Sequence, residues 1–202
     1  MTHHPVSSSL RKPDHPVNPA FINRWSPRSF VPKPMPDADL KIILEAARWA
    51  PSAFNVQPWR FVYAHRDDAM FQTFLDLLIP FNKSWAHTAS ALVFVISDTI
   101  MPGDGERPDQ ASAYHAFDSG AAWAHAALQA TMLGYHAHAT AIGDKDAIRK
   151  ELGIPERFDV QIAFAVGKLG DPADLPDGLR EREIPSTRRA LADTAWTGQF
   201  KG

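Results

Sequence analysis

The sequence predicts a protein of mixed helices and strands, in the α+β or α/β class, built as one domain with a mostly helical shell. Some stretches carry the apolar spacing of amphipathic helices, and others carry the continuous or alternating apolar pattern of strands. The two kinds of pattern intermingle along the chain, and no internal repeat is visible. With 202 residues, of which 45% are hydrophobic, the chain is long enough to bury one sizeable core.

The first half of the chain contains four predicted elements. A helix begins near Asp37, the expected N-cap, and its apolar stripe consists of Leu40, Ile43, Leu44 and Ala47. A strand is predicted over 59–65, followed by a helix over 67–78 that has two aspartates in its first turn. The continuous apolar run over 90–97 is suited to a buried strand.

The second half opens with a polar, turn-rich loop over 98–109. A long helix is predicted over 110–133, and its many alanines and glycines are typical of a helix packed closely on several sides. A short strand over 135–142, a helix over 144–153 and a strand over 159–169 are expected next.

Both ends of the chain lack helical or strand periodicity. Residues 1–17 are rich in proline, serine and histidine and are predicted to form a loose N-terminal tail. Residues 171–196 are predicted to form an arm that wraps around another part of the protein. The folded domain is therefore expected to span 18–202, with the arm included.

Composition excludes several classes of function. The absence of cysteine excludes disulfides and thiolate sites, and it is compatible with the reducing cytoplasm, which is the expected location. A net charge of -2 argues against nucleic acid or an anionic membrane as partner, and no apolar run suggests a signal peptide or a membrane span. His136 and His138 lie two apart, but their spacing suggests no third ligand, so no metal site is predicted.

The stretch "RWSPRSF" contains the first candidate binding residues, Arg24, Ser26 and Arg28. Proline disfavours helical geometry in the residue before it, so this segment is expected to be extended, with alternate side chains on one side. Two guanidiniums and a hydroxyl on one side could hold a phosphate or another electron-rich group. A solvated basic turn is the alternative interpretation.

The stretch "APSAFNVQPWRFV" carries more polar side chains than a connecting loop needs. Ser52, Asn55 and Gln57 offer hydrogen-bond donors and acceptors that match the edge of a heterocycle, and Trp59 could stack or begin the strand. Turn chemistry with a core tryptophan is the alternative. Asn82 is expected in a loop before the buried strand 90–97, where its side chain could reach a site.

Taken together, these stretches resemble the nitroreductase-like family of FMN-dependent oxidoreductases. "RWSPRSF" resembles the family pattern R-x-S-x-R-x-F, and "APSAFNVQPWRFV" resembles A-P-S-x-x-N-x-Q-P-W-x-F. Further resemblance lies in "LGYHAHATAIGDKDAIRKELGIP", in "IAFAVGKLG" and in "STRRALADTAW". The order and spacing agree over residues 20–196. The resemblance implies an α+β fold with a mostly antiparallel central sheet flanked by helices, assembled as an intertwined homodimer.

The resemblance also implies which residues bind FMN. Arg24 and Ser26 would bind the phosphate and the ribityl chain, Arg28 the pyrimidine side, and Arg188 would close on the phosphate. Asn82 would lie at the pyrimidine edge, and Ile142 and Gly143 beside flavin N5. From the partner subunit, the flavin ring would be contacted by Pro51, Ser52, Ala53 and Asn55.

Four residues depart from the family pattern. Ala141 and Asp144 stand where many members carry proline and glycine, and Asp144 could instead cap the helix that follows. Trp85 stands where some members have a lysine, and Ser186 stands where a lysine often sits. These departures leave the shape of the loop near N5 and the charge around the flavin open.

The implied activity is ping-pong hydride transfer, with NADH or NADPH as electron donor and a nitroaromatic, quinone or related electron-poor molecule as acceptor. The flavin carries the chemistry, so no side chain is expected to act as a dedicated acid or base. Two alternatives remain open. One is a specialised reaction of the same family, such as dehalogenation or flavin fragmentation, and the other is a flavin-binding dimer without turnover.

Overall fold

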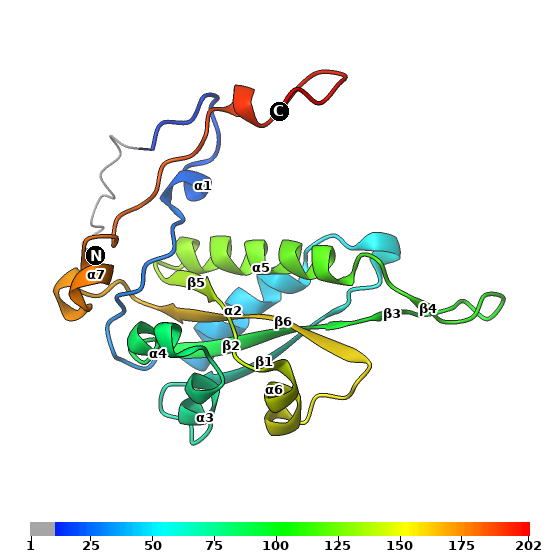
Figure 1. Cartoon of the computed structure of the whole chain (residues 1–202), viewed down its shortest axis with the longest axis horizontal. Coiled ribbons are helices and arrows are strands. Elements are labelled where there is room, and N and C mark those ends of the chain that lie inside the picture. Colours follow the sequence, from blue (N-terminus) through cyan, green and yellow to red (C-terminus); the bar gives the residue numbers. More distant parts are fainter. Residues whose placement is uncertain (1–10) are drawn as a thin grey trace.

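The computed structural model describes residues 11–202, and its centre is a four-stranded sheet (Figure 1). The strands run in the order β1-β2-β6-β5, and every neighbouring pair is antiparallel. They are β1 (Trp59–His65), β2 (Ala91–Asp98), β5 (His136–Thr140) and β6 (Phe158–Gly167). A separate hairpin of β3 (Ile100–Met101) and β4 (Gln110–Ala111) projects from one end. The α+β class with an antiparallel sheet is thereby confirmed.

Helices cover both faces of the sheet. The helices are α1 (Pro19–Asn23), α2 (Asp37–Arg48), α3 (Phe71–Asp76), α4 (Pro80–Ala86), α5 (His115–Met132), α6 (Lys145–Leu152) and α7 (Asp177–Arg180). Helices α2 and α5 pack together over one face, and α3, α4 and α6 lie over the other (Figure 1).

Strand β2 divides the core into two layers, because it is buried along its whole length. Leu92 and Phe94 pack in the cluster beneath α3, α4 and α6. Val93 and Val95 point the other way, into the cluster beneath α2 and α5. Burial of such side chains contributes about 1.5–3 kcal/mol each, so the uninterrupted apolar run is what places β2 at the centre.

Several local predictions are confirmed. Strand β1 has the predicted bounds 59–65, and β2 overlaps the predicted apolar run. Asp144 caps α6, since its side chain accepts hydrogen bonds from the backbone N–H groups of Asp146 and Ala147. Gly153 ends the same helix in the left-handed conformation, with φ of 64°, which glycine adopts without steric cost.

Other local predictions were wrong. Asp37 is the first residue of α2 and not its cap, because its carboxylate pairs with Lys41 and His65 instead. The helix predicted over 67–78 is shortened to α3, since Asp68 accepts a hydrogen bond from the backbone of His65 and holds a turn there. The long helix begins at His115, five residues after the predicted start, because β4 occupies that segment. Helices α1, α4 and α7 were not predicted.

The two ends of the described chain run side by side away from the sheet (Figure 1). Oδ2 of Asp14 accepts a hydrogen bond from the backbone N–H of Leu191 at 2.6 Å. The predicted loose tail falls outside the described residues over 1–10, whereas 11–17 lie in this paired region. In residues 11–202, no helix is both long and apolar enough to cross a membrane.

Candidate functional site

Arg24, Ser26 and Arg28 lie on a non-helical segment after α1, in the alternating arrangement that the sequence predicts. Their side chains are half-buried, whereas those of Trp25 and Pro27 between them are buried. Nη1 of Arg24 donates to Oγ of Ser26 at 3.2 Å. The polar side chains therefore share one side of the segment, and the apolar ones anchor its other side.

A cavity of about 670 Å³ lies against the polar side of this segment. Arg24, Ser26, Arg28 and His138 line it from the domain, and residues 182 and 184–188 line it from the C-terminal arm. Arg188 enters from the arm, where its Nη1 donates to Oγ of Ser186 at 2.9 Å. The volume is within the range of roughly 300–1,000 Å³ that is usual for small-molecule sites.

Positive charge in this cavity is only partly balanced. Within residues 11–202, neither Arg24 nor Arg188 forms an ion pair with a carboxylate. Burial lowers the pKa of Arg24, and the neighbouring charge of Arg188 lowers it further. Two guanidiniums and a hydroxyl without an opposing acid fit a dianionic phosphate monoester, which offers three oxygens as acceptors. The residues present therefore fit the phosphate end of FMN.

Arg28 is balanced by Glu183, a buried residue that the sequence analysis did not identify. Oε2 of Glu183 lies 3.9 Å from Nη1 of Arg28. Oε1 of Glu183 accepts from the backbone N–H groups of Arg28 at 2.5 Å and Ser29 at 2.8 Å. Because Glu183 lies in the charged run "REREI", nothing in the local sequence distinguishes this buried residue from its exposed neighbours.

His138 lines the cavity, and its ring packs on that of the buried Trp85, which lies outside the cavity lining. The two rings stack with centroids 4.7 Å apart, and Nδ1 of His138 lies 2.8 Å from the carbonyl oxygen of Pro27. Because a carbonyl can only accept, Nδ1 carries the proton. His136 packs against Trp25. No cluster of three metal-ligating side chains occurs among the described residues.

Lowering the pH from about 6.5 to about 4 is expected to destabilise the fold through these two histidines. Burial lowers the pKa of both His136 and His138 to about 4, and the positive charges of Arg24 and of Lys168 or Arg28 add to the effect. The unfolded chain binds protons near pH 6.5, before the folded one does, so stability is full above that pH and is lost below it. The loss should be on the order of 1–3 kcal/mol per histidine.

Urea unfolding across this pH range measures the effect. His138→Asn keeps a donor for the carbonyl of Pro27 and removes the titration, so the pH slope should decrease. His15→Asn changes an exposed histidine and should leave the slope unchanged. Equal slopes for His138→Asn and the unaltered protein would contradict the prediction.

Asn82 lies in helix α4, and the prediction that it sits in a loop was wrong. Pro80 at the first turn starts this short helix, whose length is too small to produce a clear apolar period. Asn82 is buried, and its Nδ2 donates to the carbonyl oxygen of Ala141 at 3.0 Å. Asn82 lies one turn before Trp85, so helix α4 connects the packed rings of Trp85 and His138 to the loop that contains Ile142 and Gly143.

Gly143 packs closely against the backbone of Leu77, at the end of α3. Its N–H donates to the carbonyl oxygen of Leu77 at 2.8 Å, and Leu78 forms a β-bridge with Ile142. A Cβ at Gly143 would lie 2.8 Å from the same carbonyl oxygen, which is too close for any other residue without a shift of the backbone. The structure therefore brings together Asn82, Ile142 and Gly143.

The loop over 51–57 lies elsewhere, at the N-terminal end of α5, whereas the C-terminal arm, whose residues line the arginine cavity, lies toward the other end of this helix (Figure 1). The backbone N–H of Ala53 donates to Oδ2 of Asp118 at 3.0 Å. Phe54, Asn55 and Gln57 all have φ between 51° and 55°. Such left-handed conformations cost non-glycine residues energy, and three of them in one loop are typical of a functional site. Within one chain, Pro51, Ser52, Ala53 and Asn55 do not reach the cavity.

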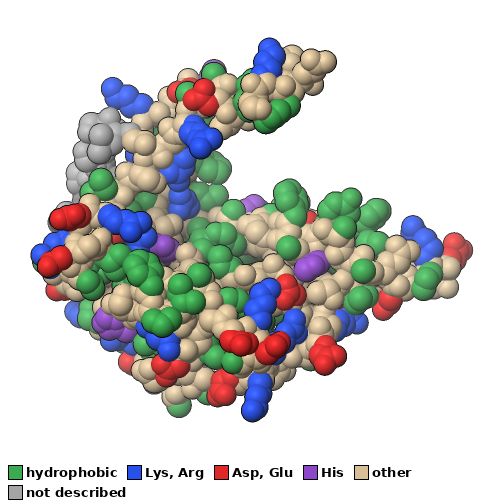
Figure 2. Space-filling view, viewed as in Figure 1, with side chains coloured by type: hydrophobic (Ala, Val, Ile, Leu, Met, Phe, Trp, Pro, Cys, Tyr) green, Lys and Arg blue, Asp and Glu red, His purple; other side chains and the backbone are tan. Residues whose placement is uncertain are grey.

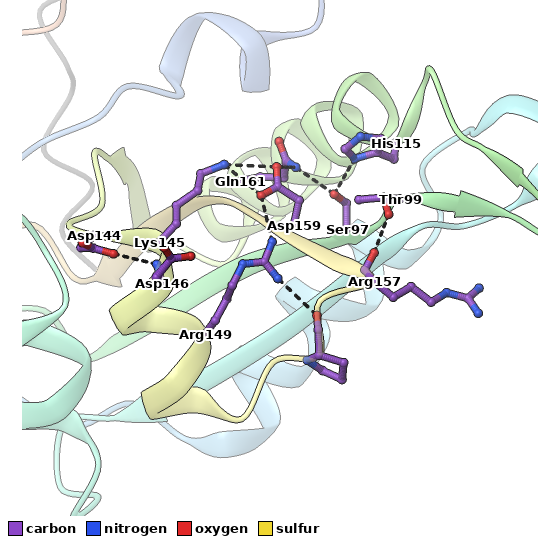
Figure 3. Close-up of polar contacts among 11 residues, drawn as sticks. Ser97, Thr99, His115, Asp144, Lys145, Asp146, Arg149, Arg157, Asp159 and Gln161 are labelled. Atoms are coloured by element: carbon purple, nitrogen blue, oxygen red, sulfur yellow. Dashed lines mark hydrogen bonds and ion pairs between the residues drawn. The ribbon is translucent and has the colours of Figure 1, made fainter.

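A serine–histidine pair lies outside both regions (Figure 3). Oγ of Ser97 is 2.8 Å from Nδ1 of His115, and it also accepts from Nε2 of Gln161 at 2.8 Å. Gln161 continues to Asp159, which pairs with Lys145. Ser97 is completely buried, so its hydroxyl is not available to a substrate. The network joins β2, β6, α5 and α6 and has a structural role.

The geometry defines an α+β protein with an arginine-lined cavity beneath a C-terminal arm and a strained loop at the far end of its longest helix. A model of the Nitroreductase family matches residues 22–168. The chain belongs to the Nitroreductase family.

Solved and curated relatives agree with this assignment. A solved structure described as "the oxidoreductase containing FMN" is 49% identical, with a TM-score of 0.92, and each chain covers the other completely. A Thermus thermophilus protein named "NADH dehydrogenase" is 30% identical over 198 residues, which is 85% of this chain and 93% of the relative. A structure from Desulfovibrio desulfuricans "in complex with fmn" has 23% identity and a TM-score of 0.69, and it supports the fold.

Proposed function

We propose that the protein binds FMN between two copies of the chain and reduces electron-poor acceptors, such as nitroaromatics or quinones, with NADH or NADPH as electron donor. The coarser conclusion, an FMN-dependent oxidoreductase, follows from the family and from the 49% identical relative described as containing FMN. The observation that carries the finer proposal is the cavity lined by Arg24, Ser26 and Arg188, where no carboxylate among the described residues balances Arg24 or Arg188. When bound, FMN supplies the hydride-transfer chemistry of the reaction.

The chain's own residues bind and orient the cofactor. Arg24, Ser26 and Arg188 bind the phosphate and ribityl chain, because they offer charge-assisted hydrogen bonds to an anion. Arg28 contacts the pyrimidine side of the flavin, and its guanidinium is held in position by the ion pair with Glu183. Asn82, Ile142 and Gly143 lie beside the flavin ring. The packed rings of Trp85 and His138 support them from within the domain. None of these side chains is assigned as a general acid or base.

A second copy of the chain completes the site. The loop that carries Pro51, Ser52, Ala53 and Asn55 is at the wrong end of α5 to serve the cavity of its own chain, since 18 helical residues span about 27 Å. Its strained backbone is held in place by Asp118 at the start of α5. This loop therefore serves the ring site of the partner.

The outer face of α5 supports the same assembly. Phe117 and Met132 are large apolar residues with 78% and 61% of their surface exposed, and Gly120 and Ala124 between them are small and exposed. Small residues allow two helices to approach closely. Figure 2 shows hydrophobic side chains along this face and the arm projecting over it, which leaves an open groove between them. A two-fold contact would bury this face on both chains at once.

Purification and turnover test the proposal together. The protein should carry one FMN per chain, elute as a dimer, and oxidise NADH or NADPH only when a quinone or nitroaromatic acceptor is supplied. A flavin-loaded protein that oxidises neither nucleotide with any acceptor in the panel would indicate a non-catalytic flavin-binding dimer. Conversion of a halogenated substrate or of the flavin itself would indicate a specialised reaction of the family. Failure to take up added FMN would refute the proposal.

A further inference from the structure

Arg11 lies outside the family motifs, in the segment that pairs with the C-terminal arm. A cavity of about 740 Å³ lies between this segment and the arm. Arg11, Arg24 and Arg188 all line it, and Arg24 and Arg188 line the first cavity as well. The two cavities therefore meet at Arg24 and Arg188, and Arg11 approaches these two side chains from the other side.

The position of the Arg11 side chain is fixed by the backbone at the C-terminal end of α1. Its Nη1 donates to the carbonyl oxygens of Ile22 and Arg24, the latter at 3.0 Å. These two bonds use both hydrogens of Nη1. In the described part of the chain, Nε and Nη2 have no hydrogen-bond partner. Toward residues 11–202, three of the five N–H donors are thus unused on a guanidinium that is held in place.

The positive charges around Arg11 favour the binding of an anion. Burial lowers the pKa of Arg11, and the positive charges of Arg188 and Arg24 lower it further, so the three guanidiniums repel one another. The carboxylate of Asp14 also lines the cavity, where it accepts a hydrogen bond from the backbone of Leu191. Over residues 11–202, no carboxylate forms an ion pair with any of the three arginines.

We propose that Arg11 is a third phosphate-binding guanidinium, which closes on the FMN phosphate from the side opposite Ser26. The inference rests on the proposed function, because FMN supplies the phosphate monoester. A phosphate dianion has enough acceptor positions for three guanidiniums and would remove their mutual repulsion. Its binding would also join the N-terminal segment to the arm, since Arg11 belongs to the first and Arg188 to the second.

Titration with FMN and with riboflavin, which lacks only the phosphate, tests the inference. Flavin-free protein is titrated with each flavin, and the quenching of flavin fluorescence gives the dissociation constant. Arg11→Ala should raise the Kd for FMN about tenfold to a hundredfold and should leave the Kd for riboflavin within about twofold of the unaltered value. Arg11→Gln keeps a polar side chain but removes the charge, and it should show the same selective loss.

The control is Lys12→Ala, which removes a neighbouring exposed charge at the same cavity. Equal losses for Lys12→Ala and Arg11→Ala would overturn the inference in favour of diffuse electrostatic attraction. Equal losses for FMN and riboflavin in Arg11→Gln would overturn it in favour of a purely structural role. If the unaltered protein binds neither flavin, the proposed function itself fails, so the two failures are distinguishable.

Discussion

Replacing Gly120 by leucine is expected to yield a folded monomer that has lost FMN. Apart from its chain neighbours and the backbone of α5 itself, no described atom lies within 4 Å of a Cβ built at Gly120, and the position is exposed, so a side chain there has open space in one subunit. Removing glycine from a helix interior should even stabilise the isolated chain by about 0.5–1 kcal/mol. If α5 packs against its counterpart, however, a leucine at this small position separates the two helices. The loop that contacts the ring from the partner is then lost.

Sedimentation and flavin absorbance measure the result. At micromolar concentration, Gly120→Leu should sediment with the mass of one chain, and its FMN content should fall more than tenfold. Gly120→Ala keeps the position small and should remain a flavin-loaded dimer. Ala147→Leu makes a comparable change on the exposed side of α6, on the opposite layer, and should alter neither property. A dimeric, flavin-loaded Gly120→Leu protein would show that this face of α5 is not the interface.

Replacing Glu183 by alanine is expected to cause the largest loss of stability among the site residues. The side chain of Glu183 is completely buried, and it accepts from the backbone N–H groups of Arg28 and Ser29. Its removal leaves both groups without this acceptor and leaves the half-buried guanidinium of Arg28 without its counter-charge. Breaking a buried ion pair from one side usually costs about 3–5 kcal/mol.

Urea unfolding of flavin-free protein separates this effect from cofactor binding. The free energy of unfolding should decrease by about 3 kcal/mol or more in Glu183→Ala. Glu183→Gln keeps one oxygen acceptor and should lose less. Glu181→Ala removes an exposed carboxylate two residues earlier and should change stability by less than about 0.5 kcal/mol. Similar stabilities for Glu181→Ala and Glu183→Ala would contradict the assigned role.

The sequence predicts those parts of the fold that depend on local chemistry. The bounds of β1, the central position of β2 and both ends of α6 follow from apolar pattern, capping and glycine conformation. Prediction from sequence fails where a polar side chain that could cap a helix instead binds a partner elsewhere in the fold. Asp37 and Asp68 both resemble helix-start residues, but Asp37 pairs with His65 at the end of strand β1, and Asp68 holds the turn after that strand.

The same distinction applies to the candidate site. Alternation around Pro27 predicts that Arg24, Ser26 and Arg28 share one side, because this is a property of a single extended segment. Glu183 is 155 residues from Arg28 along the chain, and His138 is 111 residues from Pro27. Contacts at such separations leave no periodic signal in the sequence, so only the folded structure reveals them.

The separation of the arginine cavity and the strained loop along α5 has a genetic consequence. If each site takes Arg24 from one chain and Asn55 from the other, damage to either residue in a uniform population harms every site. A mixed pair with one chain damaged at each position distributes the harm differently. One of its two sites collects both defects, and the other is assembled entirely from undamaged parts. Two separately defective alleles can therefore rescue one another in the same cell.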